Sequence, residues 1–236
     1  MKHEKISFKL RLKLFTTILK KDIKSEIRQI NDLFSILLFG VISIFIFSSA
    51  YNYSTQNQNM DLEIYVIENW FIIFFILIFI MSKLFIHERE SGTLGGLITS
   101  PVSASTILLS KIVFCFILLI FVEIIIFLFS FIFSAPVIQN LNFIQILISI
   151  ILPTIDLSIC GGLVSAFSMH TKNKSFVLPI LLFPLILPII TPIISLNINL
   201  FSGFIAPIYY ELIFIMAHIT LMVSIIVIIS QTLLYD

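Results

Sequence analysis

The sequence predicts an all-α integral membrane protein with six transmembrane helices. Hydrophobic residues make up 59% of the 236 residues and charged residues only 11%, against about 45–50% and about 25% in soluble domains. The apolar residues fall into six long runs without strand-like alternation, each near the roughly 20 residues that cross a bilayer as a helix. These runs cover residues 33–51, 70–86, 112–133, 143–167, 176–196 and 207–234.

The positions of the basic residues predict the topology. All 14 Lys and Arg residues lie before the first run or in the links that follow runs 2 and 4. The links after runs 1, 3 and 5 carry none, and the first of them contains Asp61, Glu63 and Glu68. Basic loops stay in the cytoplasm, so we expect a multi-pass protein of the cytoplasmic (inner) membrane with both termini inside the cell. We expect one transmembrane domain over 1–236, with a cytosolic or interfacial elbow at 1–32 and the six-helix part at 33–236.

The segment before the first run has the pattern of an amphipathic helix. Apolar residues recur every three or four positions from Phe8 to Ile30, and Lys and Arg residues occupy much of the remaining surface. This pattern is typical of a basic helix that lies in the membrane interface and is attracted to anionic lipid. Two roles stay open, a topology anchor and an elbow helix that packs against other transporter helices. Apolar residues also alternate from Ile6 to Leu14, as they would in a strand, so the helix is predicted from about residue 12 and the first ten residues stay open.

The link between runs 2 and 3 predicts a short helix with an apolar patch. Leu94, Leu97 and Ile98 have the spacing i, i+3, i+4, and Pro101 ends the helix because it lacks an N–H group. Ser103 or Ser105 can cap the helix that follows. Such a helix at the membrane surface is suited to docking into a groove of a soluble partner. The alternative is an ordinary structured loop.

This link also carries a recognisable motif. The run E-R-E-S-G-T-L-G-G-L-I-T-S-P at residues 88–101 resembles the signature of ABC exporter permeases, in which the segment is the coupling helix that meets the ATPase subunit. The resemblance implies docking residues at Glu88, Arg89, Glu90, Gly92, Thr93, Leu94, Leu97, Ile98 and Pro101. Gly95 and Gly96 stand where that pattern often has a Glu after the Leu.

Two later segments resemble one particular family of ABC permeases. Residues 151–162 (I-L-P-T-I-D-L-S-I-C-G-G) and 176–189 (F-V-L-P-I-L-L-F-P-L-I-L-P-I) are similar to the T-P-x-L-G and L-x-x-L-P-L-x-x-P regions of CcmB, the permease of the haem exporter in cytochrome c-type biogenesis. Asp156 stands where a small residue is more usual in that family.

The resemblance implies a membrane subunit that serves haem delivery, through release of a haem chaperone, in an ATP-driven complex. The partners implied are a CcmA-like ABC ATPase, the haem chaperone, and a CcmC-like membrane subunit or a second copy of this chain, besides membrane lipid. The chain lacks a Walker A motif, so we expect no ATPase activity of its own, and we expect no nucleic-acid partner. The alternatives are export of a drug, lipid or polysaccharide, and a scaffold that transports nothing.

Several polar residues and prolines fall inside the predicted helices. Glu123, Asp156, Glu211 and His218 should face protein or water, because a charge at the bilayer centre costs roughly 3 kcal/mol. We expect Glu123 and Asp156 to share a proton or hydrogen bond with each other or with His218, in either a structural role or a transport pathway. Pro179, Pro184, Pro188 and Pro192 should bend the fifth helix, as a rigid element or as a wall that deforms during transport.

We expect no metal site and no cofactor bound directly, with ATP on the partner and haem handled by the complex. Cys115 and Cys160 are typical of small buried hydrophobic residues. His170 and His218 could be axial haem ligands, but the chain has no tryptophan-rich outer loop. Its single Trp, Trp70, is predicted to anchor a helix end at the membrane interface.

Overall fold

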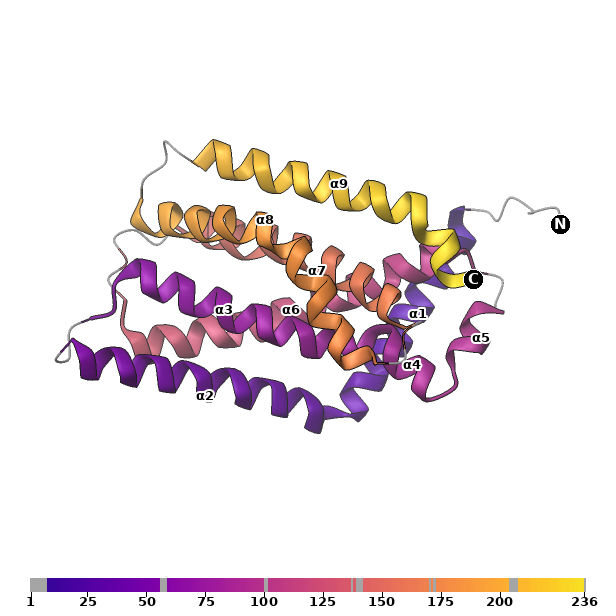
Figure 1. The fold of residues 1–236 in the computed structure, drawn as a ribbon, viewed down its shortest axis with the longest axis horizontal. Coiled ribbons are helices and arrows are strands. Elements are labelled where there is room, and N and C mark those ends of the chain that lie inside the picture. Colours follow the sequence, from indigo (N-terminus) through magenta and orange to yellow (C-terminus); the bar gives the residue numbers. More distant parts are fainter. Residues whose placement is uncertain are drawn as a thin grey trace.

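The chain folds into a bundle of membrane-length helices with one helix lying across its end (Figure 1). The computed structural model describes residues 8–55, 59–99, 102–136, 138, 142–169, 171, 173–203 and 208–235. Its long helices are α1 (Phe8–Arg28), α2 (Ile30–Ser54), α3 (Leu62–Met81), α6 (Ala104–Ser134), α7 (Phe143–Ser168), α8 (Lys174–Ser202) and α9 (Ile208–Tyr235). Between α3 and α6 lie a turn of π-helix, η1 (Ser82–Ile86), and two short helices, α4 (His87–Glu90) and α5 (Leu94–Ile98).

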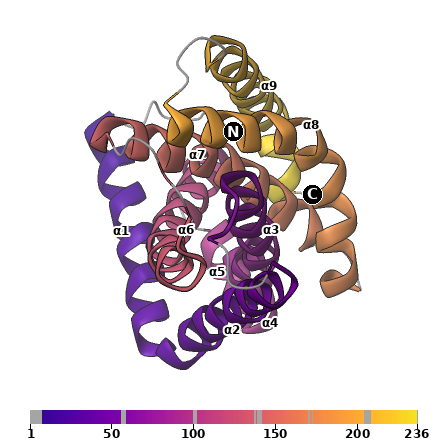
Figure 2. The same ribbon diagram turned by 90° about the vertical axis from the view of Figure 1, so that its left-hand side faces the viewer.

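Six helices of the described part are long and apolar enough to cross a membrane. They correspond to the six runs, with α3, η1 and α4 forming one continuous span from Leu62 to Glu90. The predicted all-α membrane fold is confirmed, and the described ranges contain no strand. Seen end-on, α3, α6 and α7 lie inside a ring formed by α1, α2, α8 and α9 (Figure 2).

Helix α1 runs across the bundle and packs along α6 (Figure 2). The face of α1 that is buried carries Ile18, Asp22 and Glu26, which are spaced four residues apart and so lie on one side of the helix. The predicted apolar stripe is divided: Leu19 and Ile23 in its middle pack against the core, whereas Leu12 and Ile27 near its ends are exposed. This geometry supports the elbow role, because α1 packs against its neighbours through both acidic and apolar side chains.

Two glycines set the close approach of α6 and α7. A Cβ atom added at Gly162 would lie 2.4 Å from Cγ1 of Ile112, and one at Gly161 would lie 2.9 Å from Cδ1 of Leu77. Small residues allow membrane helices to pack backbone to backbone. The Gly-Gly pair therefore seats α7 against both α3 and α6.

Helix α8 remains one continuous helix despite its four prolines. Each proline removes a backbone hydrogen bond and pushes the helix to bend. Pro184 and Pro188 are exposed at the surface, whereas Pro179 and Pro192 are half-buried. The buried face of α8 is aliphatic and includes Leu182, Ile186 and Ile189, so the bends occur in a helix that is packed on one side only.

The position of Trp70 differs from the predicted one at the membrane interface. Its side chain is fully buried and contacts the rings of Phe74 and Phe127, with centroids 6.2 Å away in both cases. The prediction of an interfacial anchor is wrong, because Trp70 fills the space between α3 and α6 instead of reaching a membrane surface.

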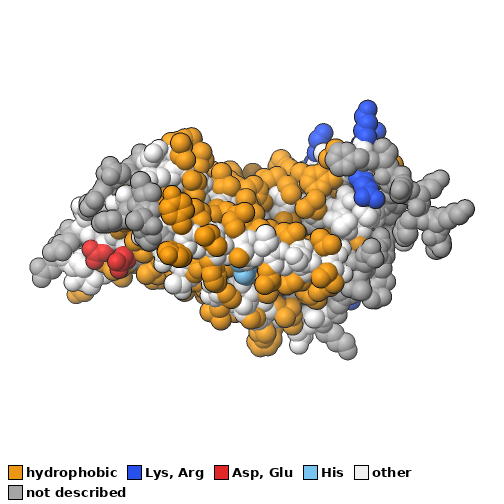
Figure 3. Space-filling view, turned by 90° about the horizontal axis from the view of Figure 1, so that it is seen from above, with side chains coloured by type: hydrophobic (Ala, Val, Ile, Leu, Met, Phe, Trp, Pro, Cys, Tyr) orange, Lys and Arg blue, Asp and Glu red, His pale blue; other side chains and the backbone are white. Residues whose placement is uncertain are grey.

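Exposed basic and acidic side chains lie at opposite ends of the face that Figure 3 shows. Figure 3 shows Lys and Arg gathered at one end, Asp and Glu at the other, and a hydrophobic belt between them. The beginning of α1 and the end of α9 lie at the same end of the bundle (Figure 1). This is the arrangement that the topology prediction requires.

Candidate coupling site and intramembrane polar groups

The predicted docking segment folds as two short helices joined by a tight turn. Helix α4 ends in a Schellman motif, in which Thr93 N–H donates to the Glu88 carbonyl at 3.0 Å and Gly92 N–H to the Arg89 carbonyl at 3.2 Å. Gly92 has φ +72°, a conformation that only glycine adopts at little cost. The E-S-G-T stretch of the motif is thus the end of one helix and the beginning of the next, α5.

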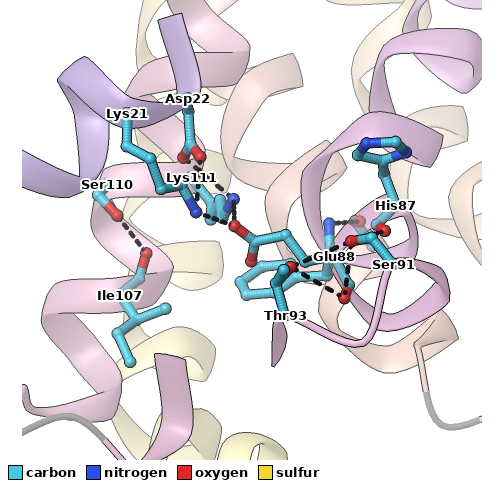
Figure 4. A network of polar contacts seen from close by, with 11 residues as sticks. Lys21, Asp22, His87, Glu88, Ser91, Thr93, Ile107, Ser110 and Lys111 are labelled. Carbon is cyan, nitrogen blue, oxygen red and sulfur yellow. Dashed lines mark hydrogen bonds and ion pairs between the residues drawn. The ribbon is translucent and has the colours of Figure 1, made fainter. Parts of the chain in front are cut away.

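Behind this turn lies a buried network of ion pairs (Figure 4). Lys111 of α6 is 1% exposed, and its Nζ lies 3.0 Å from Oδ2 of Asp22 and 2.9 Å from Oε1 of Glu88. Lys21 of α1 contacts the same two carboxylates, with its Nζ 3.2 Å from Oδ1 of Asp22. Two lysines therefore neutralise two carboxylates, and the network joins α1, α4 and α6.

Lys21 remains protonated in this network. Burial acts to lower the pKa of the Lys21 amine, but the hydrogen bond and charge of Glu88, together with Asp22, outweigh it and raise the pKa above its ordinary value. Lys21 therefore carries its positive charge throughout the neutral pH range.

A second ion pair extends the network along α1. Lys83 Nζ of η1 lies 2.5 Å from Oε1 of Glu26 and 3.8 Å from Oδ2 of Asp32 at the beginning of α2. The network around Lys111 and the pair of Lys83 and Glu26 line the same polar cavity of about 260 Å³, which lies between α1, η1, α4 and α6. Each buried carboxylate of α1 is thus matched by a lysine, Asp22 by Lys111 of α6 and Glu26 by Lys83 of η1.

The turn of π-helix before α4 is held by a serine from α7. Ser165 Oγ donates to the Met81 carbonyl at 2.8 Å and accepts from Phe85 N–H at 3.3 Å. Met81 and Phe85 are four residues apart, so the hydroxyl bridges the two groups that would bond each other in an α-helix. Single π turns inside helices are frequent at functional sites. Here the π turn couples the docking segment to α7.

The structure places the predicted docking residues on two sides of the segment. Arg89, Glu90, Gly92 and Thr93 are exposed, whereas Leu97 is half-buried and packs against the core. Glu88 differs, because it is 6% exposed and its side chain points inward to the lysines. Leu94 and Ile98 lie on α5, but their side chains, like Pro101 as a whole, fall outside the described residues.

The intramembrane polar residues form separate pairs. His218 Nδ1 of α9 lies 2.9 Å from each carboxylate oxygen of Asp156 on α7. The Glu123 carboxylate accepts a hydrogen bond of 2.5 Å from the Thr154 hydroxyl, so its partner is Thr154 and not Asp156. Glu211 accepts from the Asn199 amide at 3.4 Å. Of the predicted pairings, the one between Asp156 and His218 is confirmed. His170 lies outside the described residues.

Sequence reasoning missed the inward-facing half of this site. From the sequence, Lys21 and Lys111 contribute only to the prediction of topology. No role is predicted for Asp22, Glu26 or Ser165. A signal exists for the acids, because Asp22 and Glu26 lie four residues apart on an otherwise basic helix. Lys111, close to the start of a long apolar run, is a second signal.

The comparisons with known proteins agree with this architecture. The family model described as ABC-2 family transporter protein matches residues 30–187, which is more than half of the chain. No curated protein and no solved structure matches it. Membership of this family implies an ABC ATPase as partner and no catalytic activity in the membrane subunit itself. The chain thus belongs to the ABC-2 transporter family, as a multi-pass permease subunit of an ABC transporter.

Proposed function

We propose that the end of the molecule formed by α1, α4 and α5 receives the ABC ATPase and transmits its nucleotide cycle to the membrane helices. The observation that carries this proposal is the ion network of Lys21, Asp22, Glu88 and Lys111, which lies directly behind the exposed docking segment. A force applied to α4 reaches α6 through the Glu88–Lys111 pair and α1 through the Glu88–Lys21 pair.

Ser165 gives the same force a second route. The hydroxyl ties η1 to α7, and α7 contacts α8 and α9 along its length. A shift of α4 would therefore reach the proline-rich α8 through α7. On this proposal α8 is the wall that deforms, because its four prolines already lack backbone hydrogen bonds.

The docking part is tested by charge reversal. Arg89→Glu at the exposed docking segment should weaken co-purification with the cognate ABC ATPase and reduce the ATP hydrolysis of the complex. Glu63→Lys is the matched control, since Glu63 is exposed near the beginning of α3 at the opposite end of the bundle. Equal effects of the two variants would count against docking at α4.

For the process served, we propose delivery of haem in cytochrome c maturation. The support is the sequence similarity of residues 151–162 and 176–189 to CcmB. The chain would bind no cofactor directly, and ATP would lie on a CcmA-like subunit. A CcmC-like subunit or a second copy would complete the membrane part, and the complex would release a haem chaperone. The orientation would place both termini in the cytoplasm and the protein in the inner membrane.

Deletion of the gene tests the process. Loss of c-type cytochromes, restored by the wild-type gene but not by Arg89→Glu, is the expected result. Normal holocytochrome levels would remove the haem assignment and favour export of a drug, lipid or polysaccharide. Spin labels on α3 and α8 test transport against a scaffold: the distance between them should change during ATP turnover, and an unchanged distance would favour the scaffold.

A further inference from the structure

We propose that Asp156, Cys160 and His218 form a binding site for a zinc-class divalent cation inside the helix bundle. This site was not expected from the sequence, where the cysteines were assigned to packing. It is independent of the proposed docking of the ATPase and of the process that the transporter serves.

Three metal-binding side chains from two helices meet at this point. Their ligand atoms all lie within 4.8 Å of one another, and all three residues are buried. Asp156 and Cys160 are one turn apart on α7, so both project from the same face. His218 approaches from α9, which closes the third side.

The donor set selects the class of cation. A thiolate, an imidazole and a carboxylate are the ligands that Zn²⁺ uses, and three protein ligands leave a fourth position for water or substrate. Mg²⁺ and Ca²⁺ prefer sets made of oxygen alone. The sulfur of Cys160 therefore favours a thiophilic cation.

Charge balance favours the same occupant. A divalent cation bound to one carboxylate, one thiolate and one neutral imidazole has no net charge, which suits a site within the apolar bundle where isolated charges are costly. Binding requires the Cys160 thiol to lose its proton to solvent and the imidazole to be neutral. His218 retains 9% of its exposure, against 0% for Asp156 and Cys160, so the cation would enter beside α9.

A hydrogen-bonded pair is the competing explanation. The contacts of 2.9 Å between His218 and Asp156 need no metal, but they assign no role to Cys160. The experiment must therefore ask whether the sulfur of Cys160 binds the cation.

Cobalt titration of the purified full-length protein in detergent answers this question. The chain has two cysteines, Cys115 and Cys160, and both are free and buried. We expect one Co²⁺ per chain, the intense sulfur-to-cobalt charge-transfer band of thiolate ligation, and displacement by Zn²⁺. The band should disappear in Cys160→Ser and persist in Cys115→Ser, the matched control on α6.

Variants of the two other proposed ligands, and the effect of Zn²⁺ on thermal stability, test the site further. His218→Gln and Asp156→Asn should weaken Co²⁺ binding by at least about tenfold, because mutation of a residue that only orients a metal ligand already costs about 10–100-fold in affinity. Zn²⁺ should raise the thermal unfolding temperature of the wild type and of Cys115→Ser but not of Cys160→Ser. Size-exclusion chromatography identifies variants that fail to fold. Binding without a thiolate band, binding that Cys160→Ser leaves intact, or no binding at all would overturn the proposal.

Discussion

At the scale of single residues, the docking end depends on one buried lysine. Lys111 is almost wholly enclosed, and its amine serves Asp22 and Glu88 while lying 5.8 Å from the centre of the Phe85 ring. Lys21 binds the same carboxylates from a side chain that is half exposed to solvent. Lys21 therefore stabilises the network less than Lys111 does, because solvent screens the charge of the exposed lysine.

Replacing Lys111 tests this difference. Lys111→Met leaves Asp22 and Glu88 with one partner fewer inside the protein, and removing one member of a buried ion pair costs about 3–5 kcal/mol. Lys21→Met is the control and should cost about 1 kcal/mol or less. Thermal unfolding of the purified protein measures both. Similar losses would show that burial does not distinguish the two lysines.

The turn at Gly92 is sensitive to backbone conformation. Gly92→Ala forces an alanine into φ +72°, which costs about 1 kcal/mol. Hydrogen exchange at the Thr93 amide, which bonds the Glu88 carbonyl, should accelerate about fivefold for each such kcal/mol. Gly95→Ala is the control, because a Cβ atom there meets nothing within 4 Å. If Gly95→Ala accelerates exchange equally, the Schellman turn is not the cause.

At the scale of elements, α7 is the polar hub of the bundle. Its buried polar groups bond five neighbouring elements: Ser165 contacts α3 and η1, Thr154 contacts α6, Asp156 contacts α9, and the Ser149 carbonyl accepts from Asn197 of α8 at 3.3 Å. Hydrogen bonds between helices hold membrane bundles together where apolar surfaces alone give little preference. Motion of α7 is therefore transmitted to every helix that contacts it.

The bridge made by Ser165 gives the third prediction. Ser165→Ala leaves the Met81 carbonyl and the Phe85 amide without the bridging hydroxyl, and buried groups left unpaired cost about 1–3 kcal/mol. We expect lower thermal stability and a weaker response of ATP hydrolysis to the permease. Ser168→Ala is the control, since its buried hydroxyl has no partner in the described part of the chain. An unchanged Ser165→Ala protein would exclude the π turn from coupling.

At the scale of the whole molecule, the distribution of charged residues predicts its orientation in the membrane. The docking segment and α1 lie at one end of the bundle, and the beginning of α3, with the exposed Asp61 and Glu63, lies at the other end (Figure 1). The same end that the positive-inside rule assigns to the cytoplasm is therefore the end where an ATPase would find α4 and α5.

Labelling of single cysteines tests this orientation. Lys24→Cys on exposed α1 should react with a membrane-impermeant maleimide only in inverted vesicles. Tyr53→Cys, at a position 92% exposed, should react in intact cells. Cys115 and Cys160 are buried and provide the unlabelled background. The reverse pattern would place the docking segment outside the cell and would exclude a cytosolic ATPase partner there.

Much of the fold follows from the sequence because membrane helices are dictated locally. An apolar run of about 20 residues must satisfy its own backbone hydrogen bonds in lipid, so the six spans could be located without knowledge of their neighbours. The short helix at 94–98 was also predictable, since Leu94, Leu97 and Ile98 share one face and Gly92 ends the helix before it. Arg89 and Thr93, which the resemblance to ABC exporter permeases implied as docking residues, are exposed, as that role requires.

The partners of the buried polar groups depended on the tertiary structure. Glu88 was predicted among the docking residues, yet it points inward because Lys21 and Lys111 come from helices 67 and 23 residues away in the chain. Trp70 was predicted at the membrane interface but fills a space between α3 and α6. Local pattern determines which segments become helices and which charged ends face water. Only helix packing decides which side chains meet, as with Asp156, Cys160 and His218, because their contact depends on how α7 and α9 are placed against each other.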